Sequence, residues 1–79
     1  LSPMFQIGEV AHKLRLNSQT LYFYEQIGLI PIPQRTEAGY RLFGEADIDR
    51  LAFISRAKAL ELSLNEIKEF LTLRDRKML

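Results

Sequence analysis

The side chains of this sequence that are best suited to chemistry are those that could contact a nucleic acid. Gln19 lies in the first turn of a predicted helix, and Tyr40 and Arg41 follow Gly39 in a predicted hairpin. The first turn of a recognition helix commonly reaches base edges and phosphates in a DNA groove, and a glutamine can pair with an adenine edge. A cationic hairpin beside such a helix is suited to the phosphate backbone. The spacing therefore predicts a DNA-binding module.

The sequence contains no comparable pattern of residues for catalysis or for metal binding. The sequence contains one histidine, His12, and no cysteine, which excludes disulfides, thiolate metal sites and a zinc finger. It also lacks a Gly-rich phosphate loop and a pair of carboxylates in a cleft-forming pattern. We therefore expect no enzyme activity, no cofactor and no bound metal.

Length and composition set the class of protein. The 79 residues make one small domain, and a hydrophobic fraction of 47% is rich enough for a packed core. The net charge of +1 is weak evidence for a nucleic-acid partner, so the distribution of charge matters more than its sum. Neither a membrane span nor a signal peptide is recognisable. We expect a cytoplasmic protein without a membrane partner.

The elements that position the candidate side chains follow from local signals. Apolar residues at helical spacing predict a first helix over residues 6–14. Asn17 is a good N-cap for a second helix, which runs to about Ile27. Gly28 then suits the left-handed position that ends many helices, and the prolines that follow prevent continuation.

The second half of the chain predicts a hairpin and two more helices. Residues 35–43 read as two short extended pieces around a glycine turn. A third helix covers residues 44–60, and Leu60 is expected on its apolar face. Ser63 and Glu66 form a capping box that starts a fourth helix. Its inner face is expected to include Phe70, which completes a mainly α fold with about four helices and one small β-hairpin.

At this point the order of motifs resembles the N-terminal domain of the MerR family of bacterial transcription regulators. The resemblance covers about residues 6–71, and all of its pieces occur in order at the family's spacing. The pieces are Ile7-Gly8-Glu9-Val10-Ala11, Thr20-Leu21-x-Phe23-Tyr24-Glu25-x-Ile27-Gly28-Leu29, Arg35-Thr36-x-x-Gly39-Tyr40-Arg41-Leu42-Phe43, Asp47-Ile48-x-Arg50-Leu51-x-Phe53-Ile54 and Leu62-Ser63-Leu64-x-Glu66-Ile67.

The resemblance implies a winged helix-turn-helix fold in a dimeric regulator of transcription. A homodimer of the full-length protein would bind double-stranded promoter DNA through a recognition helix and a wing. It would deform the DNA so that RNA polymerase can engage the promoter, which agrees with the physics of indirect readout. The family's dimerisation and effector-sensing parts are expected to be absent from this chain. The chain alone should then be a monomer, acting in the bacterial cytoplasm at the nucleoid.

The domain boundaries follow from the same comparison. Leu1-Ser2-Pro3 precedes Met4, which indicates a tag remnant before the natural start. We assign residues 1–5 to a tag remnant and flexible N-terminus, residues 6–76 to the winged helix-turn-helix domain, and residues 77–79 to a flexible tail. The chain is either an excised DNA-binding domain or an unusually short family member.

The recognition helix supplies five candidate DNA contacts. Gln19 is expected to contact DNA, whereas Ser18 and Thr20 either contact DNA or only assist capping. Tyr22 stands where the family commonly carries an arginine, so fewer phosphates would be neutralised and affinity should fall less steeply with salt. Tyr24 matches a family aromatic that hydrogen-bonds a phosphate; it is alternatively a core residue, as an aromatic at helical spacing often is.

Phe23, between these two tyrosines, has no polar group. We therefore assign its side chain to the core.

The wing supplies three more candidates. The resemblance places Tyr40 and Arg41 against the DNA backbone. A short hairpin without a partner sheet has little stability of its own, so a purely structural role is a poor explanation for a cation at its tip. Arg35 either contacts a phosphate or pairs with Glu37 across the hairpin.

The third helix supplies the remaining candidates. Lys58 matches a backbone-contacting basic position of the family, with Arg56 close by. Either of them is alternatively an ordinary solvated surface residue.

One further residue departs from the pattern of the family. Glu61 stands where the family usually has glycine, at a cost of about 1 kcal/mol if its φ is positive.

An excisionase-like or architectural winged-helix DNA-binding protein is the alternative function. A longer helix following this domain in the parent gene would favour the regulator.

Overall fold

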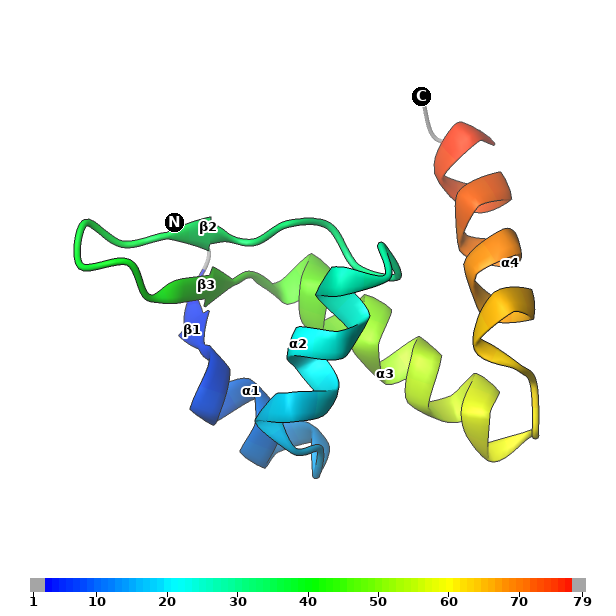
Figure 1. Ribbon diagram of the computed structural model, residues 1–79, viewed down its shortest axis with the longest axis horizontal. Coiled ribbons are helices and arrows are strands. Elements are labelled where there is room, and N and C mark those ends of the chain that lie inside the picture. The colour runs from blue at the N-terminus through cyan, green and yellow to red at the C-terminus, as the bar shows by residue number, and fades with distance from the viewer. Residues whose placement is uncertain (1–2, 78–79) are drawn as a thin grey trace.

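The computed structural model describes residues 3–77, and within them the chain forms a winged helix-turn-helix (Figure 1). The elements in chain order are β1 (Phe5–Gln6), α1 (Ile7–Leu14), α2 (Ser18–Gln26), β2 (Gln34–Arg35), β3 (Arg41–Phe43), α3 (Glu45–Ala59) and α4 (Leu64–Lys77). The predicted mainly α fold with four helices and a small wing is therefore confirmed. Most of the predicted tail over 77–79, and the first two residues of the predicted tag remnant, lie outside the described residues.

The turn between α1 and α2 is closed by backbone hydrogen bonds and a side-chain cap. Arg15 ends α1 with a φ of 55°, and the Leu16 amide donates to the Ala11 carbonyl at 2.8 Å. Asn17 then caps α2 as predicted, because its side-chain oxygen accepts from the Gln19 amide at 2.7 Å. These contacts fix the start of the recognition helix α2 relative to α1.

The end of α2 is held by a residue from far along the chain. Gly28 has a φ of 75°, which matches the predicted left-handed position after the helix. The Lys68 ammonium of α4 donates to the Ile27 carbonyl at 2.6 Å. A cation at this carbonyl suits the negative end of the helix dipole. The recognition helix is thereby fastened to α4.

The wing is a three-stranded antiparallel sheet in the order β1-β3-β2, rather than the lone hairpin that the sequence predicts. Phe5 pairs with Phe43 across β1 and β3, and Arg35 pairs with Arg41 across β2 and β3. The strand β1 begins one residue before the predicted domain boundary at residue 6, so Phe5 is part of the fold. The central strand β3 is thus supported on both sides.

The core is formed by side chains of the four helices, of strand β3 and of the segment after α2. Its fully buried side chains are Val10, Leu21, Leu29, Phe43, Leu51, Ile54, Ile67 and Leu71. Three assignments to buried faces are wrong, because Phe23 is 46% exposed, Leu60 77% and Phe70 53%. Phe70 instead stacks on Phe53 of α3, with ring centroids 5.4 Å apart.

The connection between α3 and α4 contains the predicted strain and the predicted cap. Glu61 has a φ of 67°, so a residue with a side chain occupies a conformation that favours glycine. Ser63 and Glu66 exchange hydrogen bonds of 2.9 and 3.1 Å between side chains and backbone amides, which confirms the capping box. The backbone amide of Ser63, and after it the Ser63 side chain, lower the pKa of the Glu66 carboxyl from its ordinary value.

The arrangement in Figure 1 places the wing at one end of the domain and α4 at the other, with α2 between them. Arg50 of α3 links α4 to the segment after α2, because it donates to the Leu29 carbonyl at 3.0 Å and to the Asp75 carboxylate at 3.1 Å. Over residues 3–77, no helix is long and apolar enough to cross a bilayer.

Candidate nucleic-acid interface

The first turn of α2 presents one exposed polar side chain. Gln19 is exposed, and only its backbone amide is engaged by the Asn17 cap. Ser18 and Thr20 are half-buried, and the Thr20 amide donates to the Asn17 carbonyl at 3.0 Å. Gln19 is therefore the residue of this turn with the greatest freedom to reach a base edge.

The aromatic residues of α2 are buried and exposed in a different order from the one expected from the sequence. Tyr24 is only 4% exposed and its ring belongs to the core, whereas Phe23 points outward. Burial raises the pKa of the Tyr24 hydroxyl, so that hydroxyl stays protonated and able to donate. Among the described residues no partner is recorded for it. Tyr22, in contrast, is 37% exposed on the side of α2 that faces the wing.

The turn of the wing is tightly hydrogen-bonded. The Thr36 amide donates to the Tyr40 carbonyl at 2.8 Å, and Gly39 adopts a φ of 91° that a side chain would make unfavourable. Arg35 donates to the Gly39 carbonyl at 2.9 Å. In the described part of the chain it forms no ion pair with Glu37, so that alternative is wrong. Tyr40 is 61% exposed and free to contact a partner.

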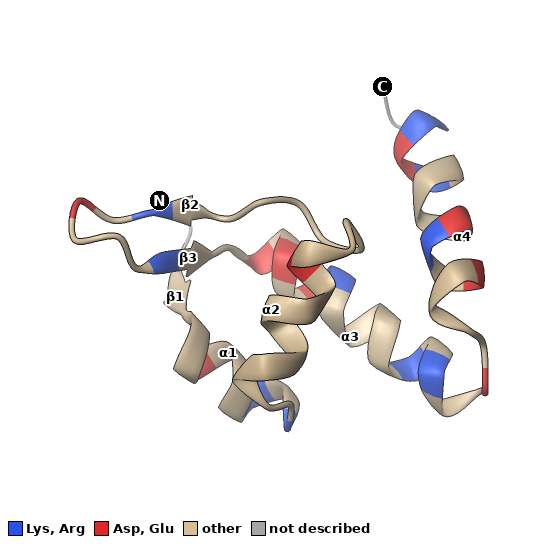
Figure 2. Ribbon diagram, viewed as in Figure 1, with Lys and Arg blue, Asp and Glu red and all other residues tan. Residues whose placement is uncertain are grey.

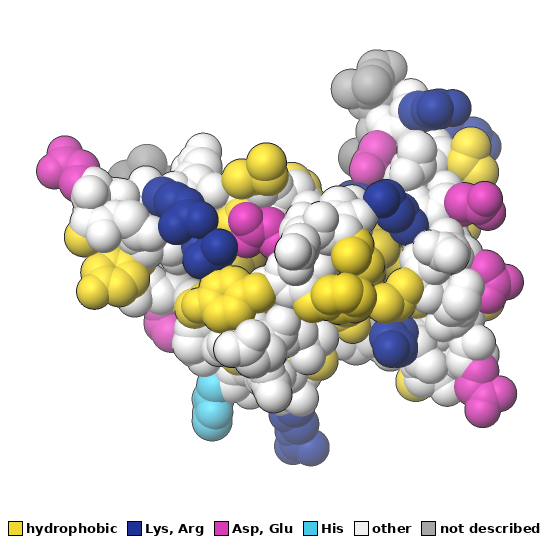
Figure 3. All heavy atoms as spheres, in the orientation of Figure 1, with side chains coloured by type: hydrophobic (Ala, Val, Ile, Leu, Met, Phe, Trp, Pro, Cys, Tyr) yellow, Lys and Arg dark blue, Asp and Glu magenta, His cyan; other side chains and the backbone are white. Residues whose placement is uncertain are grey.

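Arg41 is the most constrained cation of the interface. Its Nε donates to the Glu25 Oε1 of α2 at 2.7 Å, and the two side chains are only 23% and 17% exposed. The Arg41 guanidinium carbon also lies 4.6 Å from the centre of the Tyr22 ring, a cation–π contact. Basic, acidic and hydrophobic side chains are adjacent where the wing meets α2 (Figure 3).

Glu25 is the residue that the sequence analysis missed at this site. A signal for it was present, because Glu25 follows Tyr22 by three positions and such residues share one helix face. An acidic side chain on the side of α2 that faces the basic wing is suited to pair with a cation of the protein itself. The sequence did not indicate that this cation is Arg41.

The two basic candidates of α3 lie apart from the wing. Arg56 and Lys58 are exposed in the last turn of α3, whereas the wing precedes its first turn. In the view of Figure 2, α2 lies between the basic residues of the wing and those at the end of α3. Arg56 lines a hollow with Arg50 and Arg74 between α3 and α4. The structure thus groups Arg35, Tyr40, Arg41 and Tyr22, and leaves Arg56 and Lys58 as a separate patch.

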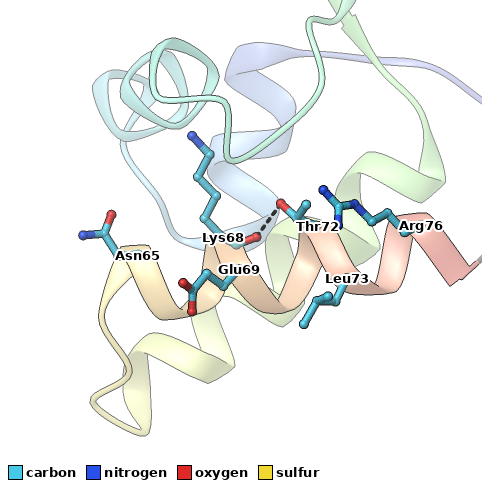
Figure 4. A pocket seen from close by; sticks show the side chains of 6 residues that line it. All are labelled: Asn65, Lys68, Glu69, Thr72, Leu73 and Arg76. Carbon is cyan, nitrogen blue, oxygen red and sulfur yellow. Dashed lines mark hydrogen bonds between the residues drawn. The ribbon is translucent and has the colours of Figure 1, made fainter.

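Away from the wing and α2, the described residues offer a hollow along α4. No group of three or more His, Cys, Asp or Glu side chains that could hold a metal occurs between residues 3 and 77. A shallow hollow of about 690 Å³ runs along α4 and is lined by Asn65, Lys68, Glu69, Thr72, Leu73 and Arg76 (Figure 4). Lys68 is already engaged with the end of α2.

A helix-turn-helix joined to a sheet wing, with a polar first turn on α2 and basic residues on the wing, defines a winged helix-turn-helix DNA-binding domain. Residues 5–73 match the family described as "MerR HTH family regulatory protein". The chain belongs to the MerR family, a non-enzymatic class of DNA-binding transcription regulators.

Two relatives illustrate the similarity in sequence. The chain is 49% identical over 72 residues to the mercuric resistance operon regulatory protein of Bacillus cereus, with 91% of this chain and 54% of that protein covered. It is 39% identical over 71 residues to the regulator ZntR of Escherichia coli, with 90% and 50% covered. The chain spans about half the length of these curated relatives.

Two solved structures illustrate the similarity in fold. PbrR691 from Ralstonia metallidurans CH34, in complex with lead(II), superposes with a TM-score of 0.84 at 44% identity over 95% of this chain and 59% of that one. HiNmlR, a MerR family regulator lacking the sensor domain and bound to promoter DNA, gives 0.85 at 30% identity over 91% and 55%.

Proposed function

We propose that this domain binds promoter DNA with α2 in the major groove and the wing on the adjacent backbone. The observation that carries this proposal is the contact between Arg41 of the wing and Tyr22 of α2 at 4.6 Å. Because of that contact, the recognition helix and the wing form one continuous surface. The promoter-bound relative HiNmlR supports DNA as the partner.

Each candidate side chain has a role in this proposal. Gln19 reads a base edge from the first turn, while Ser18 and Thr20 contact phosphate near the helix start. Tyr22 packs under the wing and also meets the backbone. Tyr24 offers its protonated hydroxyl to a phosphate from a ring fixed in the core.

The wing and α3 complete the backbone contacts. Arg35 and Tyr40 reach a phosphate from the exposed wing turn, and Arg41 does so through the guanidinium nitrogens that Glu25 does not engage. Arg56 and Lys58 extend the footprint on the other side of α2.

A protein that carries this domain at the full length of its relatives would act as a homodimer at two half-sites. That dimer would deform the promoter so that RNA polymerase can engage the promoter. It would act at the nucleoid, in the bacterial cytoplasm. The isolated chain, without the avidity of a dimer, would be monomeric and bind weakly.

Fluorescence anisotropy tests the proposal on the 79-residue chain. The duplex upstream of its own gene and a scrambled duplex of equal length are titrated across a series of salt concentrations. We expect tighter binding to the upstream duplex and a linear fall of log affinity with log salt, since each neutralised phosphate releases counterions. Equal affinity for both duplexes, also after fusion to a dimeric coiled coil, would refute sequence-specific binding.

A further inference from the structure

Glu25 places a negative charge on the side of α2 that meets the wing. The Glu25 carboxylate lies 2.7 Å from the Arg41 Nε and is only 17% exposed. A lone carboxylate beside DNA phosphates is repelled by them. This position is therefore favourable only while Arg41 remains at the carboxylate.

Arg41 is confined from three directions. Glu25 engages its Nε, the Tyr22 ring lies 4.6 Å from its guanidinium carbon, and its strand position is directly opposite Arg35. Like charges opposite each other destabilise a strand pair, so Arg41 is also pushed away from Arg35. Arg35 is itself turned to the Gly39 carbonyl. Together these contacts hold the guanidinium in the angle between wing and helix.

The guanidinium retains N–H groups for a partner. Its Nε is engaged by Glu25, and no hydrogen bond of its two terminal nitrogens is recorded within residues 3–77. A guanidinium donates in a fixed planar fork, so fixing the Nε also fixes the direction of the remaining N–H groups. Those groups can then meet a phosphate in only a narrow range of positions.

We propose that Glu25 is a specificity-determining positioning residue: it holds Arg41 so that the wing accepts a phosphate only where the promoter backbone presents it. The carboxylate also offsets the charge of Arg41, which weakens attraction to DNA of arbitrary sequence. When the DNA backbone presents a phosphate in the right position, it meets the preorganised N–H groups of Arg41. When the phosphate lies elsewhere, the Arg41 guanidinium cannot turn toward it. This inference rests on the proposed DNA-binding function.

The first test examines the free chain. The ¹H–¹⁵N signal of the Arg41 Nε–H should exchange slowly with solvent in the wild type, because a short ion pair shields it. Glu25→Ala should accelerate that exchange, whereas Glu69→Ala removes the same charge from the exposed surface of α4 and should leave it unchanged. An Arg41 signal that is equally protected in Glu25→Ala would overturn the proposal.

The second test compares the upstream and scrambled duplexes by anisotropy. We expect Glu25→Ala to lower the ratio of the two affinities by roughly fivefold, which corresponds to about 1 kcal/mol for this ion pair, whose side chains are 23% and 17% exposed. It should also steepen the salt dependence on scrambled DNA by about one unit, because Arg41 is then free to reach any phosphate. Glu69→Ala should change neither quantity.

A double mutant separates positioning from a direct effect of Glu25. In the Arg41→Ala background, Glu25→Ala should leave the affinity ratio unchanged, since the residue acts through Arg41. An equal effect in both backgrounds would overturn the proposal, because Glu25 would then act on DNA by itself. Glu25→Gln, which keeps an acceptor without the charge, should fall between Glu25→Ala and the wild type and covers the case in which the alanine variant folds poorly.

The outcomes distinguish this proposal from the function on which it rests. A wild-type chain that does not prefer the upstream duplex rejects sequence-specific binding and the role of Glu25 together. A wild-type chain that prefers it, with an unchanged ratio in Glu25→Ala, rejects only the role of Glu25.

Discussion

Replacing Glu61 with glycine should stabilise the domain. Glu61 follows the end of α3 with a φ of 67°, where its amide donates to the Lys58 carbonyl at 2.9 Å. The next amide, of Leu62, donates to the Ala57 carbonyl at 3.2 Å. These two hydrogen bonds hold the backbone in the left-handed region. The exposed Glu61 side chain forms no ion pair with residues 3–77, so it adds strain without a compensating contact.

The size of the effect follows from two opposing contributions. A residue with a side chain in the left-handed region is destabilised by about 1–2 kcal/mol relative to the right-handed one. Glycine removes that strain but gives the unfolded chain more conformational freedom, which offsets about 0.5–1 kcal/mol. The net gain for Glu61→Gly is about 0.5–1 kcal/mol. For a domain of this size, about 1 kcal/mol raises Tm by roughly 4–8 °C.

Urea and thermal unfolding, followed by far-UV circular dichroism, measure this gain. Glu61→Ala is the matched control, since it removes the carboxylate near the negative end of α3 but keeps the strain. The difference between the glycine and alanine variants therefore isolates the backbone contribution. Arg15, with a φ of 55°, allows the same comparison at the end of α1. A glycine variant no more stable than the alanine variant at Glu61 would refute the assignment of strain.

Three further predictions concern the interface and the cap. Tyr24→Phe should weaken DNA binding by roughly tenfold while leaving the urea midpoint unchanged, because the ring stays packed and only the hydroxyl is lost; unchanged affinity in the anisotropy assay would remove Tyr24 from the interface. Gln19→Ala should alter the ranking of duplexes that differ at single base pairs, and equal losses on every duplex would assign Gln19 to the backbone instead. The lowered pKa of Glu66 means that its cap contributes stability above the ordinary value of 4.5 and that this contribution is lost as pH falls through the lowered folded value. Urea midpoints measured from neutral to acidic pH should therefore fall less for Glu66→Gln than for the wild type, and parallel curves would contradict this linkage.

Helix ends could be predicted from the sequence because their signals are local. Asn17 caps α2, Gly28 takes the left-handed position after it, and Ser63 and Glu66 form the capping box of α4. Each of these interactions spans only a few residues, so the residue types alone define it. For Glu61, only the family's usual glycine indicated that a positive φ was possible, and the structure shows it.

Burial of individual side chains could not be predicted as well. Phe23 and Tyr24 are adjacent, so periodicity alone does not decide which aromatic ring enters the core, and the lack of a polar group on Phe23 favoured the wrong ring. Leu60 lies at the end of α3 and is 77% exposed. Phe70 stacks on Phe53 instead of entering the core.

Contacts between segments far apart in the chain could not be predicted from the sequence. The strand β1 contains two residues, too few to show an alternating pattern, and its partner β3 lies beyond both helices of the helix-turn-helix. The pair of Glu25 and Arg41 likewise joins α2 to the wing only once both are placed. The ten candidate contacts with DNA therefore stay predictions, and what the structure adds is the grouping of those on the wing with α2.

The sheet order β1-β3-β2 has a consequence for how the domain folds. The pairing of Phe5 with Phe43 closes a loop that contains α1, α2 and β2, whereas the helices form from contacts between near neighbours. Pairing two strands across a long loop is slower than forming a helix, because the entropy of closing the loop is lost before the strand contacts form. During synthesis on the ribosome, β1 emerges first but has no partner until β3 has followed it. We therefore expect the helix-turn-helix to assemble early and the wing to be completed last.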